Sequence, residues 1–418
     1  MKEVCVIGLG YIGLPTAAML ASHGIQVKGV DVVPDIVDTI NRGEVHIQEP
    51  DLKELVKKVV SEGKLKASLR VEACEAFIIA VPTPITDEKE VDLSHVKAAA
   101  RQIYPVLKKG NLVVLESTVP PKTTEEVLVP ILEKSGLQAG VDFYVAHCPE
   151  RVLPGRILYE LENNNKVIGG INRISAEKGR DLYRVFVKGQ LFITDASTAE
   201  MCKLMENTYR DVNIALANEL ARICEGIGIN AWDVIKHANK HPRVDLHKPG
   251  PGVGGHCLAV DPWFIIKAQP GISRMIKMAR QINDSMPRYV FEKIKGLVAP
   301  GEKIVILGYT YKADVDDIRE SPIAALVEIL RVESLYTVEI VDPYRREFDK
   351  DIYEAARDSS LILLGVNHRQ FQDIRFDLLA KVMKNKVILD TRNDIQREKA
   401  AEFGFRYYLL GDGRGGWQ

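Results

Sequence analysis

A short apolar run, three spaced glycines and a helical pattern follow one another at the start of the chain. Residues 4–7 (VCVI) lead into Gly8-Leu9-Gly10-Tyr11-Ile12-Gly13, and the helical pattern continues to about residue 23. Gly8 permits a tight turn, Gly10 lets the backbone approach a pyrophosphate, and Gly13 allows the helix to pack closely on the strand. The segment therefore predicts the first strand, turn and helix of a dinucleotide-binding fold, with the helix N-terminus facing phosphate charge.

A carboxylate follows the next expected strand. The run 25–30 ends at Asp31, whose side chain can accept hydrogen bonds from both hydroxyls of an adenosine ribose. Val32, Val33 and Pro34 come next, so no arginine is present there to hold a 2′-phosphate. These residues favour NAD over NADP. A lone GxGxxG motif is weak evidence, and its alternative interpretation is a glycine-rich turn without a ligand.

Apolar runs alternate with helical stretches beyond this unit. Such alternation predicts a parallel, doubly wound sheet. In sheets of this kind ligands bind beyond the carboxyl ends of the strands, where Thr83, Thr118 and Glu150 fall. Each of the three can instead be ordinary turn chemistry. The further strands expected in this half are 76–81, 112–116 and 144–148.

One long helix is expected over residues 197–226, which contain no glycine or proline until their end. Lys203 and Asn207 are four residues apart and therefore project from one face. An ammonium and an amide placed in this way can both donate to a developing oxyanion, although a solvated surface pair is the alternative. The apolar remainder of the helix suits packing against a second subunit, so we expect a homodimer or a higher homo-oligomer.

A second alternating series starts with a strand at 303–308 and lacks the glycine fingerprint. Lys312, Arg319 and Arg392 lie at or soon after expected strand ends, where a diphosphate would be met, although surface lysines and arginines are usually solvated. The chain is therefore predicted to form two Rossmann-like, doubly wound α/β domains joined by a central helical region with one long helix. The expected domains are 1–195, 196–298 and 299–418.

Cys257 lies in the glycine- and proline-rich stretch PGPGVGGHCLAVDPWF, residues 249–264. This composition argues against an ordinary helix or strand core, and a thiol on such a turn can attack a carbonyl carbon. Asp261 follows four residues later, close enough to act on the same reacting centre. The alternative is a small, buried, unreactive cysteine.

The composition argues against several classes of binding partner, namely nucleic acids, membranes and metal ions. The 56 basic and 57 acidic residues give a formal charge of -1, so nothing in the bulk charge favours nucleic-acid or membrane binding. The six cysteines show no CxxC spacing, so neither a metal site nor a dense disulfide framework is expected. No run approaches membrane-spanning length and no export signal is recognised. We expect a cytoplasmic protein with reduced thiols.

Together these motifs resemble the UDP-glucose/GDP-mannose dehydrogenase family, from GLGYIG to DTRN, and GGHCxxVDPWF is the most specific of them. The resemblance implies a four-electron oxidation of a sugar C6 alcohol to a carboxylate by two NAD+ in succession. The GPGVGGHC form implies UDP-N-acetyl-D-mannosamine as substrate and its uronate as product. UDP-N-acetylglucosamine and UDP-glucose are the alternatives, and a non-catalytic sensor of NAD or UDP-sugars is the alternative from another class.

The resemblance also implies roles for single residues. Cys257 matches the nucleophile, Lys203 and Asn207 the oxyanion-stabilising pair, and Asp261 a residue that helps to activate water. Thr118 and Glu150 match positions that hold a catalytic water and assist proton transfer. The implied cofactor contacts are Gly8, Gly10, Tyr11, Ile12, Gly13, Asp31, Thr83, Thr118 and Arg319.

The implied substrate contacts come from both halves of the chain. Arg243 matches an arginine that in relatives reaches the substrate of a neighbouring subunit, and Lys312 and Arg392 match contacts to the UDP part. One departure is Val260, which replaces a lysine of the glucose enzymes, so any contact made by that lysine is not expected here. The full set of expected substrate contacts is Glu150, Lys203, Asn207, Arg243, Gly254, Lys312 and Arg392.

Overall fold

A computed structural model describes residues 1–86, 88–153 and 155–414 of the chain. The predicted domain boundaries at 195 and 298 stay a prediction, and positions 87, 154 and 415–418 of the first and last predicted domains lie outside the described residues. Contacts divide the chain into two compact units, the first formed by 1–206 with 263–269 and the second by 207–262 with the residues from 270 onward.

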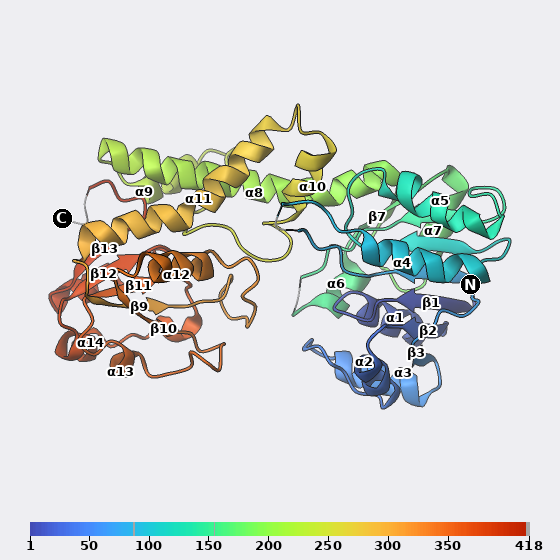
Figure 1. The fold of residues 1–418 in the computed structure, drawn as a ribbon, viewed down its shortest axis with the longest axis horizontal. Coiled ribbons are helices and arrows are strands. Elements are labelled where there is room, and N and C mark those ends of the chain that lie inside the picture. The colour runs from blue at the N-terminus through green and yellow to red at the C-terminus, as the bar shows by residue number, and fades with distance from the viewer. Residues whose placement is uncertain (87, 154, 415–418) are drawn as a thin grey trace. The chain divides into compact units, whose positions relative to one another are not determined.

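The first unit is built on an eight-stranded sheet with the order β3-β2-β1-β4-β5-β6-β7-β8 (Figure 1). The central strand β1 (Glu3–Ile7) pairs in parallel with β2 (Gln26–Val30) and with β4 (Ala76–Ile79). Its successive side chains enter two different core clusters, one containing Val4 and the other Cys5. Both faces of the sheet are therefore buried under helices, as in doubly wound folds.

One strand pair departs from the predicted parallel sheet. β6 (Tyr144–His147) and β7 (Lys166–Gly170) run antiparallel, with Ala146 opposite Gly170. Among the described residues between them, the one helix is α6 (Ile157–Asn163), which has seven residues and is about 10 Å long. It is too short to return the chain to the opposite edge of the sheet, as the crossover of a parallel pair requires.

The last strand of this sheet passes directly into the long helix. β8 (Leu191–Asp195) is followed without an intervening residue by α8 (Ala196–Ile227), a helix of 32 residues. Gly169 of β7 lies under the junction, because a Cβ atom there would come within 2.3 Å of the Asp195 carbonyl oxygen. The predicted long helix is confirmed, and its first turn is packed tightly on the sheet.

The second unit contains a five-stranded, fully parallel sheet with the order β10-β9-β11-β12-β13 (Figure 1). The side chains of β9 (Lys303–Leu307) again alternate between two buried clusters, with Ile304 in one and Val305 in the other. The predicted fold class, two Rossmann-like α/β domains with a helical region containing one long helix, is confirmed.

The remaining helices and strands of each unit are as follows. Those of the first unit are α1 (Gly13–Ser22), α2 (Pro34–Asn41), α3 (Leu52–Ser61), β3 (Leu65–Ser68), α4 (Ser94–Ile103), η1 (Tyr104–Val106), β5 (Leu112–Leu115), η2 (Thr124–Leu128), α5 (Val129–Leu132), η3 (Glu133–Ser135) and α7 (Arg173–Tyr183). Those of the second unit are α9 (Ala231–Ala238), α11 (Arg274–Leu297), α12 (Pro322–Glu333), β10 (Thr337–Val341), α13 (Ile352–Ala355), β11 (Leu361–Leu364), η4 (Arg369–Phe371), α14 (Phe376–Val382), β12 (Val387–Asp390), α15 (Arg397–Glu402) and β13 (Arg406–Leu409). Helix α10 (Asp261–Ala268) contributes residues to both units.

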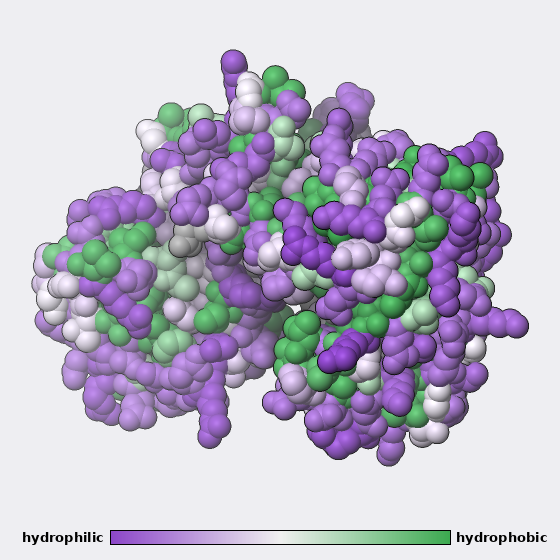
Figure 2. All heavy atoms as spheres, turned by 45° about the vertical axis from the view of Figure 1, so that its right-hand side comes forward, coloured by the Kyte–Doolittle hydropathy of each residue, from purple (hydrophilic) through white to green (hydrophobic). Residues whose placement is uncertain are grey.

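Hydrophilic side chains predominate on the face shown in Figure 2, where the apolar ones form separate patches. Within the described part of the chain, no helix combines the length and the apolar character that crossing a membrane requires.

Candidate active site

The glycine turn after β1 has room for a phosphate at one position only. Gly8 has a φ of +88°, and a Cβ atom on Gly13 would lie 1.8 Å from the Gly8 carbonyl oxygen. At Gly10, in contrast, an added Cβ atom would meet nothing within 4 Å. Gly8 and Gly13 are therefore required for packing, whereas Gly10 leaves open the space that a pyrophosphate would approach.

Asp31 lies at the end of β2, next to this turn. Its Oδ2 accepts a hydrogen bond from the backbone N–H of Leu9 at 2.9 Å, and its Oδ1 accepts one from the N–H of Val33 at 3.0 Å. Each carboxylate oxygen retains acceptor capacity for a ribose hydroxyl. Tyr11 and Ile12 complete the turn, with Tyr11 exposed and Ile12 half-buried. These residues fit NAD, which would be held by the turn and by the Asp31 carboxylate.

Two predicted residues from neighbouring strands are in contact. Thr83 follows β4 and Thr118 follows β5, and the Thr83 hydroxyl donates to the Thr118 carbonyl oxygen at 2.6 Å. The adjacent Ser117 hydroxyl donates to the Val81 carbonyl oxygen at 2.7 Å. The two loops are thus fastened to each other at the carboxyl edge of the sheet, where a doubly wound fold binds its ligand.

Glu150 belongs to a buried group of polar side chains that the sequence analysis missed. Its Oε2 lies 2.5 Å from the Nζ of Lys166, and both side chains are buried. The Lys166 ammonium is also 5.3 Å from the centre of the Tyr183 ring, and the Tyr183 hydroxyl donates to Oε1 of Glu116 at 2.6 Å. A lysine at the first position of the apolar strand KVIGG was a usable signal, because a buried lysine needs an anionic partner.

Burial dominates the electrostatics of this group. It raises the pKa of Glu116 to about 7, against the opposing attraction of Lys166. Burial alone would lower the pKa of Lys166, but the negative charge of Glu150 and its neighbours outweighs burial and the net shift is upward. Lys166 is therefore charged at neutral pH. Burial also raises the pKa of Cys148 to about 12, which makes that thiol a poor nucleophile.

Three of the predicted catalytic residues meet in the second unit. The half-buried Cys257 precedes α10, and its carbonyl oxygen accepts the N–H of Asp261 at 2.8 Å. Oδ2 of Asp261 accepts a hydrogen bond from Nδ2 of Asn207 at 2.5 Å, and both of these side chains are buried. Lys203 is half-buried and lies one turn before Asn207 in α8. The Asn207 amide thus fixes a carboxylate beside the cysteine turn.

A buried polar network that the sequence analysis also missed holds the start of this turn. Arg280 of α11 forms an ion pair of 2.5 Å with Asp211 of α8, and Asn283 donates to Asp211 at 2.8 Å. Asn218 then donates to Asn283 at 2.9 Å and accepts the N–H of Gly250 at 2.8 Å. Asp211 and Asn218 are seven residues apart, so both project from one side of α8. In the sequence, two polar residues at this spacing within a helix were the feature that could have indicated the network.

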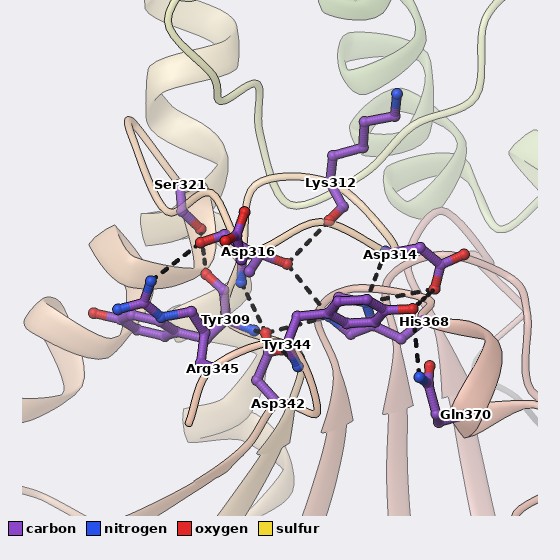
Figure 3. Close-up of polar contacts among 12 residues, drawn as sticks. Tyr309, Lys312, Asp314, Asp316, Ser321, Asp342, Tyr344, Arg345, His368 and Gln370 are labelled. Atoms are coloured by element: carbon purple, nitrogen blue, oxygen red, sulfur yellow. Dashed lines mark hydrogen bonds and ion pairs between the residues drawn. The ribbon is translucent and has the colours of Figure 1, made fainter. Parts of the chain in front are cut away.

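The expected nucleotide contacts of the second unit surround the carboxyl ends of its strands. Lys312 is exposed, and Figure 3 shows its side chain pointing away from the polar cluster formed by Asp342 and His368. The Nε of Arg392 donates to the Gly365 carbonyl oxygen at 2.8 Å. Burial lowers the pKa of Arg392 to about 10, so its guanidinium stays charged at neutral pH and gains from an anionic ligand.

The other expected contacts have different surroundings. Arg319 forms an ion pair with Asp317 at 2.6 Å, and this hydrogen-bonded pair raises the pKa of Arg319. Gly254 is packed so closely that a Cβ atom would lie 2.5 Å from the Glu320 carbonyl oxygen. Arg243 is exposed on the loop after α9, away from regular secondary structure.

Comparisons with known proteins agree over almost the whole chain. Three sequence profiles of the UDP-glucose/GDP-mannose dehydrogenase family match: its NAD binding domain over residues 2–187, its central domain over 197–285 and its UDP binding domain over 305–397. A Methanococcus maripaludis protein named UDP-N-acetyl-D-mannosamine dehydrogenase is 47% identical over 429 residues, which cover 99% of this chain and 98% of that protein.

Two further proteins are similar. A Ralstonia nicotianae protein named NDP-N-acetyl-D-galactosaminuronic acid dehydrogenase is 47% identical over 94% of this chain and 96% of its own length. The solved structure of the UDP-D-ManNAc dehydrogenase from Pyrococcus horikoshii superimposes with a TM-score of 0.92 at 43% identity, covering 99% of this chain and 100% of that one. With its NAD binding, central and UDP binding regions all matched, the chain belongs to the UDP-glucose/GDP-mannose dehydrogenase family.

Proposed function

We propose that this chain is an NAD-dependent UDP-N-acetyl-D-mannosamine 6-dehydrogenase. The arrangement of Cys257, Asp261 and Asn207 carries the proposal, because a cysteine whose turn leads directly into a fixed carboxylate residue suits covalent oxidation of a carbonyl carbon. The choice of sugar is supported by the relatives of that name, which match essentially the full chain. The product is UDP-N-acetyl-D-mannosaminuronate.

When bound, NAD supplies the hydride acceptor for both oxidations. The residues of the chain have to keep the half-oxidised sugar in place. The Cys257 thiolate adds to the C6 aldehyde, giving a thiohemiacetal that is retained and can be oxidised to a thioester. Lys203 and Asn207 donate to the oxyanion of each tetrahedral stage, and removal of one such donor typically costs about 3 kcal/mol of transition-state stabilisation.

Hydrolysis and proton transfer are assigned to the carboxylates. Asp261 activates the water that hydrolyses the thioester, and its hydrogen bond from Asn207 keeps the carboxylate oriented. Glu150 moves the proton of the C6 hydroxyl with the help of a water held by Thr118. The buried ammonium of Lys166 keeps Glu150 in place for this task.

Binding of the UDP part is assigned to the second unit. Lys312 and Arg392 supply positive charge for the diphosphate. Gly254 contacts the substrate through its backbone in this proposal, because its side-chain position is filled by the Glu320 carbonyl oxygen. Arg319 contacts the cofactor in this proposal, and Arg243 serves the substrate of a neighbouring subunit.

One assay tests the sugar and the covalent scheme together. The protein is incubated with NAD+ and separately with UDP-N-acetylmannosamine, UDP-N-acetylglucosamine, UDP-N-acetylgalactosamine and UDP-glucose, and NADH is counted per sugar consumed. We expect two NADH per UDP-N-acetylmannosamine. The galactosamine arm is included because of the Ralstonia relative. Faster turnover of another sugar contradicts the proposed substrate. One NADH per sugar, with release of an aldehyde, contradicts the proposed thioester intermediate.

The nucleophile has a matched control within the chain. Cys257→Ser should abolish turnover, because a serine hydroxyl is a far weaker nucleophile at neutral pH, while UDP-sugar binding measured by calorimetry should stay within about threefold of wild type. Cys202 is likewise half-buried and outside any disulfide, so Cys202→Ser serves as the control and should keep full turnover. Wild-type turnover in Cys257→Ser would remove the cysteine from the reaction.

We further propose that the protein forms homodimers through α8. Tyr209, Leu216 and Ile223 are spaced seven residues apart and are 58%, 48% and 54% exposed. Residues at this spacing form one apolar stripe along a helix, as in coiled-coil seams. Leu216→Glu with Ile223→Glu should convert the dimer to a monomer in light scattering, whereas the exposed control Glu219→Gln should not. A monomeric wild type would contradict the interface.

A cytoplasmic location is part of the same proposal. None of the six cysteines, all of them among the described residues, forms a disulfide, as expected in a reducing compartment.

A further inference from the structure

We propose that His368 is a positioning residue, which holds the loop over residues 309–321 in the shape that supports both the Cys257 turn and UDP binding. The proposal rests on the proposed function, in which Lys312 of this loop binds the diphosphate. It adds a residue that lies outside every motif singled out in the sequence.

The loop over residues 309–321 is in direct contact with the turn that precedes Cys257. The N–H of Gly255 donates to the Arg319 carbonyl oxygen at 2.9 Å. A Cβ atom on Gly255, whose φ is +87°, would lie 2.8 Å from the Tyr311 ring, and one on Gly254 would lie 2.5 Å from the Glu320 carbonyl oxygen. The glycine turn therefore fits only while the loop keeps its present shape.

His368 joins this loop to the sheet through both of its ring nitrogens. Nδ1 accepts the backbone N–H of Asp314 at 2.9 Å. Nε2 lies 3.2 Å from Oδ2 of Asp342 and 3.3 Å from Oγ1 of Thr310. Because the Asp314 amide can only donate, Nδ1 carries no proton in this arrangement, and Nε2–H donates to the Asp342 carboxylate. One neutral imidazole thus connects the middle of the loop to the carboxylate at the end of β10.

The surroundings leave the ring little freedom. His368 is fully buried, and its ring stacks on Tyr344 with the centroids 4.9 Å apart, while Phe371 meets it edge-on at 5.5 Å. The Asp314 carboxylate accepts hydrogen bonds from the Tyr344 hydroxyl at 3.1 Å and from Nε of Arg369 at 2.8 Å. The loop is thus held at Asp314 by groups of two other segments, Tyr344 after β10 and the neighbouring residues 368 and 369 after β11 (Figure 3).

The same cluster sets the position of Lys312. The Thr310 hydroxyl, which also contacts His368, donates to the Lys312 carbonyl oxygen at 3.0 Å. The backbone of Lys312 is therefore fixed, while its side chain points out of the cluster (Figure 3). An ammonium on a fixed backbone loses less conformational freedom when it binds a phosphate. Loosening of the loop should therefore weaken UDP binding.

Substitution of His368 by asparagine or by glutamine tests the two hydrogen bonds of the ring one at a time. In His368→Asn the side-chain oxygen can take the place of Nδ1 and accept the Asp314 N–H. In His368→Gln the amide nitrogen can take the place of Nε2 and donate to Asp342, but the Asp314 N–H loses its acceptor. We expect the Gln variant to bind UDP about tenfold more weakly than wild type and the Asn variant within about threefold, because an unpaired buried donor is costly.

The experiment measures the Kd of UDP and the Kd of NAD for the full chain by calorimetry, with the Tm of each variant. A general loss of stability would affect both amide variants, whereas a positioning role separates them in UDP affinity and changes NAD affinity less, because Arg319 alone of this loop is assigned to the cofactor. Equal UDP affinity in the Gln variant and wild type overturns the proposal, as does an Asn variant as weak as Gln.

Hydrogen exchange of the wild type gives a test that needs no variant. The Asp314 amide should be strongly protected, and its exchange at the rate of an open loop overturns the proposal. These measurements use UDP, not a sugar nucleotide. A wild type that turns over no UDP-N-acetylmannosamine would therefore remove the proposed function, while the UDP and exchange results would still decide the role of His368.

Discussion

Asp342 occupies in the second unit the position that Asp31 occupies in the first. Each carboxylate follows the strand next to the first strand of its sheet and accepts the N–H of the residue after the turn glycine, Leu9 at 2.9 Å and Tyr309 at 2.6 Å. The surroundings differ. Asp31 is half-buried, whereas Asp342 is fully buried and also bonded to His368. The Asp31 carboxylate can therefore bind a ribose, whereas the Asp342 carboxylate is bonded to other groups of the protein.

Asparagine at these two positions should therefore have different effects. Asp31→Asn removes a charged acceptor from the cofactor site, so the Kd of NAD should rise by about tenfold or more, with UDP binding unchanged. Asp342→Asn should lower the Tm further and weaken UDP binding, with a much smaller effect on NAD binding. Calorimetry with both ligands measures the contrast. Equal losses of NAD affinity in the two variants would contradict it.

The turn glycines offer a second matched pair. Gly10→Ala adds a methyl group that meets no protein atom within 4 Å, so the Tm should stay near wild type while the Kd of NAD rises. Gly13→Ala places its methyl group 1.8 Å from a carbonyl oxygen, so it should destabilise the fold by about 1–3 kcal/mol or more. Thermal melts and NAD titrations distinguish the two. An unchanged NAD affinity in Gly10→Ala would argue against a pyrophosphate at this turn.

Glu116 should make stability depend on pH. Its pKa is raised to about 7 by burial, so between its ordinary value and pH 7 the folded state binds more protons than the unfolded state. Its contribution is then fully present in acid and is lost as pH rises towards 7, by about 3 kcal/mol in total. Glu116→Gln removes this dependence while keeping an acceptor for Tyr183.

The measurement is urea unfolding of Glu116→Gln and wild type from pH 5 to pH 8. The stability of the variant relative to wild type should increase with pH. The exposed Glu54→Gln is the control and should show no such trend. A difference between Glu116→Gln and wild type that stays constant with pH would show that Glu116 is ionised throughout.

Lys166 should be needed for both stability and rate. Lys166→Met leaves the Glu150 carboxylate buried without its partner, which should cost about 3–5 kcal/mol of stability and lower kcat, because Glu150 is no longer held in place. Lys166→Arg keeps the charge and should retain most of the activity. In the double variant with Glu150→Gln, the destabilisation should be smaller than the sum of the single effects. Additive effects would show that the two residues are independent.

Features with a local cause were predictable from the sequence. The positive φ at Gly8, the close packing at Gly13 and the carboxylate at Asp31 are each specified within one strand, turn and helix unit. The long helix was predictable because only its end contains a helix breaker. The roles of Cys257 and the other site residues stay predictions until the assays above are made.

Features that depend on distant residues were not predictable in this way. Asp211 and Arg280 are 69 residues apart, and neither position indicates that the other is its partner. The antiparallel pairing of β6 and β7 depends on how far the short α6 extends, which local patterns do not specify. The position of Asp342 at the end of a strand could have been predicted, because TVEIVD at 337–342 repeats the pattern of QVKGVD at 26–31.

The absence of a linker between β8 and α8 has a consequence for engineering. With no spare residue at Asp195 and with Gly169 pressed against that point, the strand and the first turn of the helix form one mechanical piece. A hybrid enzyme that exchanges cofactor domains between relatives at this junction would separate a strand and a helix turn that are packed against each other. A fusion point further along α8, beyond its contacts with the sheet, would transfer β8 and the first turns of α8 together from one enzyme to the other.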